Sequence, residues 1–245
     1  SPFEKIHIPP TCDDSGLSTG AAQYLYYNVL GKKRSKGSRS KKFSTPYLGI
    51  KYQSVEIINR LKKEKQNLVF EVLANSEKFA AIDLHKNKIV AWFESRSEVG
   101  PRALGHRSLF ANPKFRDNWE KMNELKNREK WRPFAPAVLE EDIGKYFTGI
   151  PTESPFMLFT AQVKTKELPA ITHVDNTARV QTVTEETGGR FNILKYFKHL
   201  SGISVLLNTS FNGPREPIIE RPEEAIQFLL SHNLDVLYID KVRVS

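Results

Sequence analysis

Helical spacing of apolar positions alternates along this chain with short continuous apolar runs. Apolar residues three and four apart predict a helix over 55–61, and amphipathic patterns predict helices over 118–125 and 191–200. Another helix is expected to begin at Pro222, because acidic residues follow in its first turn. A further helix, rich in Ala and Tyr, is expected over 17–30.

Strands are predicted where short apolar runs lie between turn residues. The segment 79–84 fits either a helix or a strand. Helices that alternate with strands indicate an α/β or α+β fold, and we find no internal repeat. The predicted strands are 88–93, 156–163, 178–183, 205–208 and 234–239, the last of them closing the fold.

Composition agrees with a globular protein. Of the 245 residues 39% are hydrophobic and 27% are charged, which suits one core or one core with an appended fragment. No apolar run approaches the ~20 residues that span a bilayer, so we expect no membrane association. The first residues show no signal-peptide pattern, and without an initial Met we expect a partial or processed enzyme. The single cysteine, Cys12, suits a reducing, cytoplasmic location.

The formal net charge is +9, and much of the excess lies in the segment 31–42. This segment is rich in Gly and Ser and poor in apolar residues, which predicts a flexible, solvated linker. Lys/Arg runs also attract nucleic-acid phosphates. Because no aromatic interleaving or base-reading fold accompanies the run, we do not expect nucleic-acid binding.

Three arginines surround a tight Gly-Pro turn after the strand expected at 88–93. Arg96, Arg102 and Arg107 could bind phosphate or carboxylate with their forked guanidinium groups. The alternative is a basic surface turn in which the arginines pair with nearby glutamates. The segment alone leaves these interpretations evenly balanced.

A second basic stretch, 126–138, mixes cationic and aromatic residues before a Pro-Phe-Ala-Pro run. Prolines stiffen the backbone, so Arg132 is expected on a rigid segment. The alternative is a solvated helix end whose cations favour the helix dipole.

A third stretch, 205–214, reads as an apolar strand that ends in small polar residues. Asn208, Ser210 and Asn212 could hydrogen-bond a ligand's phosphate or carbonyl at the strand end. A locally hydrogen-bonded turn is the common alternative.

Four motifs in this order together resemble the NodU-like nodulation and antibiotic O-carbamoyltransferase family. The resemblance runs nearly end to end but concerns only the C-terminal YrdC-like part of that family, whose members are usually about twice this length or more. The motifs are Gly-Pro-Arg-Ala-Leu-Gly-His-Arg-Ser at 100–108, Trp-Arg-Pro-Phe-Ala-Pro at 131–136, Asp-Asn-Thr-Ala-Arg-Val-Gln-Thr-Val at 175–183 and Leu-Asn-Thr-Ser-Phe-Asn at 207–212.

The resemblance implies three parts. Residues 43–245 would form a YrdC-like twisted mixed sheet with flanking helices, after a basic flexible linker over 31–42. Residues 1–30 would be the tail of an actin/Hsp70-like carbamoyl-transfer domain, in which Asp14 matches a metal-binding aspartate. The alternative role for Asp14 or Ser15 is a helix N-cap. Fe²⁺ or another divalent metal would bind only together with the missing N-terminal half of the enzyme.

The resemblance also implies a reaction. Carbamoyl phosphate and ATP, with Mg²⁺, would give carbamoyladenylate, pyrophosphate and phosphate. The carbamoyl group would then pass to a small-molecule hydroxyl acceptor in the N-terminal half.

By their match to the family motifs, Lys126 and Arg132 are expected to clamp phosphates, with Arg102 beside them. Arg179 and Ser210 are expected to bind ATP or carbamoyl phosphate, with Asn208, Asn212 and Arg107 as further ligand-binding candidates.

Two aromatic residues near these motifs are expected to be structural. Trp131 could stack on a base, but a core or rim aromatic is the more common role, and His173 is expected to be hydrogen-bonded within the fold. Arg215 stands where the family carries Gly and adds a cation near the third motif. The rival interpretations of the whole chain are an RNA-binding YrdC-like module and an inert regulatory domain.

Overall fold

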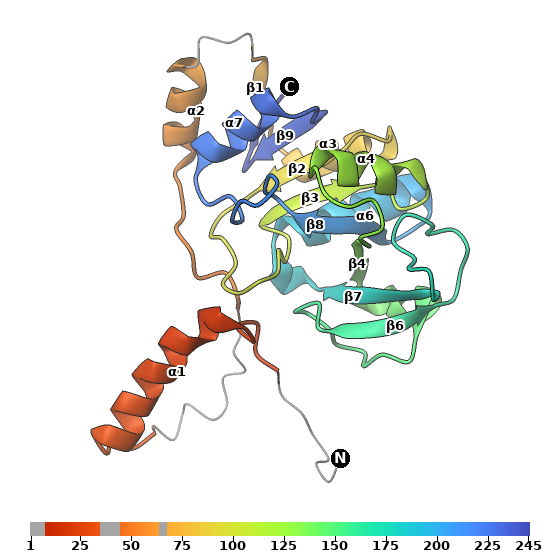
Figure 1. Cartoon of the computed structure of the whole chain (residues 1–245). Coiled ribbons are helices and arrows are strands. Elements are labelled where there is room, and N and C mark those ends of the chain that lie inside the picture. The colour runs from red at the N-terminus through yellow and green to blue at the C-terminus, as the bar shows by residue number, and fades with distance from the viewer. Residues whose placement is uncertain (1–7, 35–44, 64–67) are drawn as a thin grey trace.

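The computed structural model describes residues 8–34, 45–63 and 68–245. Within them the chain forms a mixed α/β fold around one ten-stranded sheet (Figure 1). The strands are β1 (Phe70–Val72), β2 (Val90–Phe93), β3 (Arg107–Ala111), β4 (Ala135–Leu139), β5 (Phe147–Thr148), β6 (Phe159–Val163), β7 (Thr177–Val183), β8 (Val205–Ser210), β9 (Val236–Ile239) and β10 (Val242–Val244).

The order of strands across the sheet is β1-β10-β9-β2-β3-β8-β4-β7-β6-β5. The pairs β2–β9 and β4–β7 are parallel and the other pairs are antiparallel. Pro136 lies in the central strand β4, although proline cannot donate a ladder hydrogen bond. Its position is tolerated because the pairing of β4 with β7 begins one residue later, at Ala137.

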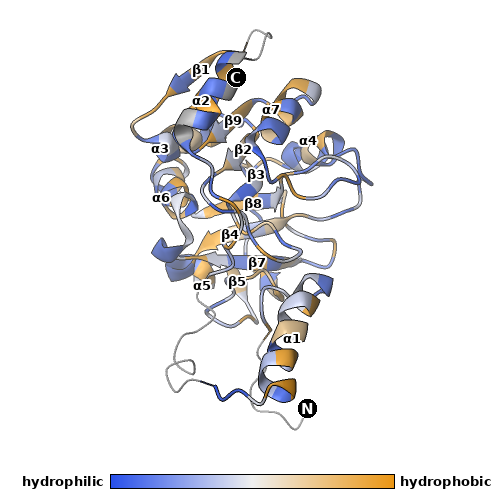
Figure 2. Cartoon of the chain, turned by 90° about the vertical axis from the view of Figure 1, so that its left-hand side faces the viewer, coloured by the Kyte–Doolittle hydropathy of each residue, from blue (hydrophilic) through white to orange (hydrophobic). Residues whose placement is uncertain are grey.

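Helices cover both faces of the sheet. Figure 2 shows α3 and α6 on one side and α4 and α7 on the other. Pairing between α3 and α6 is the most extensive contact between any two elements. The helices of four or more residues are α1 (Leu17–Tyr24), the π-helical turn η2 (Leu25–Val29), α2 (Ser54–Lys63), α3 (Ser76–His85), α4 (Asp117–Leu125), α5 (Ile143–Tyr146), α6 (Gly189–Ser201) and α7 (Pro222–Ser231).

The core lies between the sheet and these helices. Strands β2, β3, β4 and β9 are buried along their whole length. Trp92 of β2 packs against Tyr238 of β9, with the ring centroids 5.6 Å apart. Burying an aromatic side chain of this size contributes on the order of 2–3 kcal/mol, so the two parallel central strands anchor the sheet.

Most predicted elements are found in the structure. The helices expected at 55–61, 118–125, 191–200 and Pro222 are α2, α4, α6 and α7, and the ambiguous segment 79–84 is the helix α3. The mixed α/β fold class is confirmed.

Two predicted strands need correction. Residues 156–158 are not extended, because Met157 adopts a positive φ of 56° and β6 starts only at Phe159. The strand predicted at 234–239 does not close the fold. Asp240, with φ 49°, turns the chain into β10, which pairs back on β9.

The N-terminal part lies apart from the sheet. Figure 1 shows α1 projecting away from the body, and none of its residues is buried. Of the predicted linker 31–42 the structure describes only 31–34, and the remainder lies outside the described residues. In the part of the chain that the structure describes, no helix is long and apolar enough to cross a membrane.

Gly188 and Gly202 bound α6 and both have φ 79°, but their surroundings differ. A Cβ at Gly188 would lie 2.3 Å from Glu94 Oε1 and 3.0 Å from His106 Nε2, whereas a Cβ at Gly202 would meet no atom within 4 Å. Gly202 has a left-handed backbone conformation. Gly188, with ψ −153°, lies in a region of backbone dihedral angles that essentially only glycine adopts.

We therefore expect Gly202→Ala to lower the free energy of unfolding by about 1–2 kcal/mol. Gly188→Ala should lower it by at least about 3 kcal/mol, because backbone strain and a buried clash add. Urea denaturation of both variants beside the wild type measures this difference. Equal losses would show that the space around Gly188 is not limiting.

Candidate functional site: a polycationic double pocket

Four strand ends meet at one edge of the sheet. Because β3 and β4 run antiparallel to β8, and β7 runs parallel to β4, the start of each lies near the end of β8. Arg102 precedes β3, Arg132 precedes β4 and Arg179 lies near the start of β7. Ser210 is the last residue of β8. Four motifs that are far apart in sequence are thus brought to one place.

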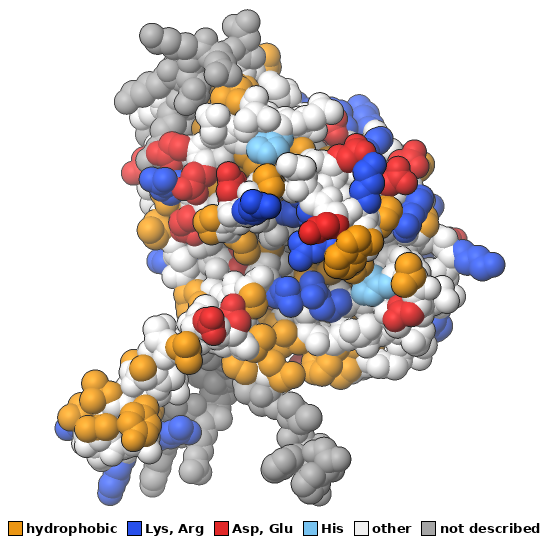
Figure 3. All heavy atoms as spheres, viewed as in Figure 1, with side chains coloured by type: hydrophobic (Ala, Val, Ile, Leu, Met, Phe, Trp, Pro, Cys, Tyr) orange, Lys and Arg blue, Asp and Glu red, His pale blue; other side chains and the backbone are white. Residues whose placement is uncertain are grey.

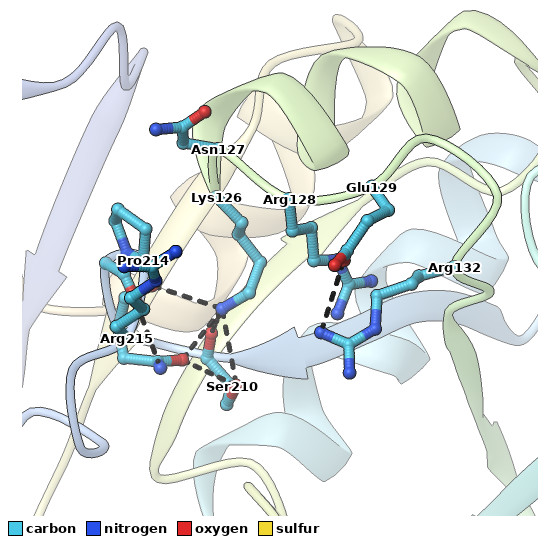
Figure 4. A pocket seen from close by; sticks show the side chains of 10 residues that line it. Lys126, Asn127, Arg128, Glu129, Arg132, Ser210, Pro214 and Arg215 are labelled. Carbon is cyan, nitrogen blue, oxygen red and sulfur yellow. Dashed lines mark hydrogen bonds and ion pairs between the residues drawn. The ribbon is translucent and has the colours of Figure 1, made fainter.

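The end of α4 positions two further cations. Asn127 takes a left-handed conformation with φ 40° just after the helix. Its N–H donates to Glu124 O at 2.9 Å, and the N–H of Arg128 donates to Asn123 O at 3.1 Å. This is the hydrogen-bond pattern of a Schellman motif. It ends the helix so that Lys126 and Arg128 point toward β8 while Asn127 points away (Figure 4).

Lys126 is buried, with 5% of its surface exposed, so the alternative interpretation of a solvated helix end is wrong for this residue. Its Nζ donates to Ser210 O at 2.6 Å and Asn212 Oδ1 at 2.7 Å, and it also contacts Asn212 O at 3.1 Å and Ser210 Oγ at 3.3 Å. All four acceptors are neutral. Burial, and then the charges of Arg128 and Arg132, lowers the pKa of Lys126 to about 7.

A pocket of about 760 Å³ opens beside Lys126. Figure 3 shows Lys and Arg side chains gathered at the centre of the face in view. Arg132 and Arg215 contribute charge from opposite sides of the pocket, and Glu129 lies 3.7 Å from Arg132. The lining residues are Lys126, Asn127, Arg128, Glu129, Arg132, Ser210, Asn212, Gly213, Pro214 and Arg215.

A smaller pocket of about 110 Å³ adjoins the first. Arg102 and Arg179 line it, and the Nε of each is buried without a hydrogen-bond partner in the described residues. Burial, and then the charge of Arg102, lowers the pKa of Arg179 to about 10. Asn208 forms part of the wall, where its Nδ2 donates to Gln181 Oε1 at 2.9 Å.

Arg128 and Ser210 line both pockets, and the sequence analysis gave Arg128 no role. Its Nε donates to Asn123 Oδ1 at 2.7 Å, and its guanidinium lies 4.2 Å from the centroid of the Phe134 ring. Burial, and then the charge of Arg132, lowers the pKa of Arg128 to about 10. The sequence feature that could have indicated a role for Arg128 is its position two residues after Lys126, at the C-terminus of a predicted helix.

The two pockets together concentrate positive charge. Among the described residues that line them, Glu129 is the single carboxylate. Buried cations without paired carboxylates are costly, and their ordinary partners are anions. The arrangement is therefore suited to bind a multiply charged anion such as a phosphate chain. The cations are Lys126, Arg128, Arg132 and Arg215 in the larger pocket, and Arg102, Arg128 and Arg179 in the smaller one.

Two of the three arginines around the Gly-Pro turn, Arg96 and Arg107, line neither pocket. Arg107 is fully buried and lines neither pocket, contrary to its expected part in ligand binding. Its guanidinium donates to Glu94 O at 2.7 Å and Ser95 O at 3.2 Å, and it lies 3.5 Å from the Phe93 ring centroid. Arg96 donates to Gly49 O. Both side chains therefore stabilise neighbouring backbone segments by hydrogen bonds to carbonyl groups.

The alternative interpretation, in which these arginines pair with nearby glutamates, is wrong. Glu98 Oε1 accepts hydrogen bonds from the N–H groups of Leu104 and His106, each at 2.7 Å. Glu94 Oε1 lies 3.2 Å from His106 Nε2, and burial raises the pKa of Glu94. The two carboxylates thus fix the turn that carries Arg102.

Asp14 is exposed in the N-terminal segment and lines neither pocket. The helix start there is capped by Asp13, whose Oδ1 accepts from the N–H of Ser15, rather than by Asp14 or Ser15 as expected. Among the described residues no three His, Cys, Asp or Glu side chains form a group that could hold a metal. The metal site expected to form together with the N-terminal half of the enzyme stays a prediction.

His173 has the structural contacts expected of it. Its Nδ1 lies 3.1 Å from Thr177 Oγ1, and burial lowers its pKa.

The fold has counterparts among known proteins. The fold is YrdC-like, and a crystal structure of full-length HypF in its phosphate- and nucleotide-bound form superposes with a TM-score of 0.50. That match has 22% sequence identity and covers 71% of this chain and 22% of HypF, which shows likeness of fold.

Sequence relatives are closer. Nodulation protein NolO of Bradyrhizobium diazoefficiens is 35% identical over 245 residues, covering 97% of this chain and 44% of NolO. A 3'-hydroxymethylcephem-O-carbamoyltransferase of Amycolatopsis lactamdurans is 31% identical, covering 97% of this chain and 43% of its own length. The chain thus spans less than half the length of these relatives. The family model described as "Carbamoyltransferase C-terminus" matches residues 81–245, and the chain belongs to this carbamoyltransferase family.

The lowered pKa of Lys126 predicts pH-dependent anion binding. Protonated Lys126 attracts an anion, and the proton is lost as the pH rises through about 7. We expect sulfate, whose charge is constant in this range, to bind best near pH 6. Its affinity should fall by up to about tenfold per pH unit above 7.

Calorimetric titration of sulfate between pH 6 and 9 measures this dependence. In Lys126→Met, which keeps the length of the side chain but removes its charge, the affinity should be weaker and independent of pH. An unchanged pH profile in this variant would assign the titration to another group.

Proposed function

We propose that this domain binds carbamoyl phosphate and ATP and forms carbamoyladenylate for transfer to a hydroxyl acceptor. The observation that carries the proposal is the convergence of six cationic side chains, four of them buried or half-buried, on two adjoining pockets with one carboxylate in their described lining. Membership of the carbamoyltransferase family supports a transferase role. The name of the cephem relative identifies a hydroxymethyl group as its acceptor, which supports a hydroxyl acceptor here.

The sizes and linings of the pockets favour a division between the two substrates. The larger pocket, with Lys126 and Arg132, would hold the phosphates of ATP. The smaller pocket, with Arg102 and Arg179, would hold carbamoyl phosphate. Mg²⁺ in nucleotide sites is held by one or two carboxylates and the phosphates themselves, and Glu129 could supply such a ligand.

The proposed chemistry needs positioning and charge neutralisation. Water releases phosphate from carbamoyl phosphate and leaves carbamate. A carbamate oxygen then attacks the α-phosphorus of ATP, and the bond to the β-phosphate breaks as pyrophosphate leaves with the electron pair. Arg128 lies where it can contact both anions, so it would offset their mutual repulsion as they approach.

Transfer completes the reaction. The acceptor hydroxyl attacks the carbamoyl carbon, AMP leaves, and the hydroxyl proton is lost. The acceptor site, the actin/Hsp70-like half and its metal would belong to the N-terminal part of the enzyme, and the chain spans less than half the length of the relatives.

The adenylating half-reaction predicts pyrophosphate release from ATP that requires carbamoyl phosphate. Lys126→Met and Arg132→Ala should each lower the rate by at least about 100-fold, because removing one donor that stabilises charge in the transition state commonly costs 10²–10³ in rate. A coupled pyrophosphate assay with Mg²⁺ measures it.

The matched control is Lys195→Ala, which removes an exposed lysine of α6 that pairs with Glu141, and its rate should equal that of the wild type. Release without carbamoyl phosphate, or equal rates in all four proteins, would refute the proposal.

A further inference from the structure

Trp131 is exposed beside the larger pocket, although tryptophan is among the most apolar side chains. It keeps 74% of its surface exposed, whereas Trp92 is buried and Trp119 is half-buried. Its neighbours Glu129 and Arg132 both line the pocket. Of the core or rim role that was expected for Trp131, the core role is therefore excluded, and a rim position remains.

Hydrogen bonds from two side chains of α4 fix the backbone around Trp131. The Nδ2 of Asn123, a fully buried residue, donates to Lys130 O at 3.4 Å and Arg132 O at 3.2 Å. The Nε1 of Trp119 also donates to Arg132 O, at 3.0 Å. The carbonyls on both sides of Trp131 are thus fixed, so the exposed indole projects from a rigid segment.

The indole ring makes no contact with another ring or with a cation in the part of the chain that the structure describes. Within the described residues it takes part in no aromatic pair or cation–π contact, while the Trp119 ring lies 4.1 Å from the guanidinium of Arg116. A rigid, unpartnered aromatic face next to a phosphate pocket has the chemistry of a stacking platform, because every nucleobase presents a flat π surface.

We infer that Trp131 stacks on the base of the nucleotide whose phosphates occupy the larger pocket. The inference rests on the proposed function and adds to it. The cations of the pocket recognise only the phosphate chain of a ligand. Because Trp131 contacts the base, it makes the pocket select nucleoside polyphosphates over inorganic polyphosphates. Trp131 is thus a specificity-determining residue.

Calorimetric titrations of the 245-residue chain with ATP and with inorganic tripolyphosphate separate the two contributions. Trp131→Ala should bind ATP roughly tenfold more weakly, with tripolyphosphate affinity unchanged. Trp131→Phe should keep most of the ATP affinity, because its ring also stacks. The matched control is Val174→Ala, which removes another fully exposed apolar side chain outside the pocket lining and should change neither affinity.

Fluorescence gives a second readout. ATP, but not tripolyphosphate, should change the tryptophan emission of the wild type, and the change should vanish in Trp131→Phe.

Unchanged ATP affinity in Trp131→Ala would overturn the inference and leave Trp131 as a surface for packing against other protein. Parallel weakening of both ligands would also overturn it, because the residue would then act on the loop. A wild type that binds neither ligand would instead sink the proposed function itself.

Discussion

Uncompensated positive charge is the constraint on which this site depends. Burial removes water from Lys126, Arg128 and Arg179, and the pKa of each is lowered as a result. The fold bears this cost without supplying matching carboxylates. Neutral oxygens at the end of β8 solvate the Lys126 ammonium in their place. These cations are therefore left with the capacity to be neutralised by an anionic ligand.

The sheet makes this crowding possible. Strand β8 lies between β3 and β4, so its end receives the segments that lead into both neighbours. Hydrogen bonds to backbone then hold these segments in place. Glu98 fixes the turn before β3, and Asn123 fixes the segment before β4. Like charges can stay close because their backbones cannot move apart.

The sequence predicted much of the fold and the residues that the pockets bring together. The match to contiguous family motifs made Lys126, Arg132 and Ser210 visible, since such motifs can be compared without knowledge of the fold. Other features depend on contacts distant in sequence. Arg107 looked like its neighbour Arg102, and only the pairing of β2 with β3 buries it against Phe93 and backbone carbonyls. The short strand β10, which lies between β1 and β9, follows from a positive φ at Asp240, which no pattern revealed.

Arg128 belongs to both pockets, and this has a thermodynamic consequence. Two ligands that share one guanidinium cannot bind independently. Whatever factor the first anion imposes on the affinity of the second, the second must impose on the first. The double pocket is therefore a linked system, in which occupancy of either half reports on the other.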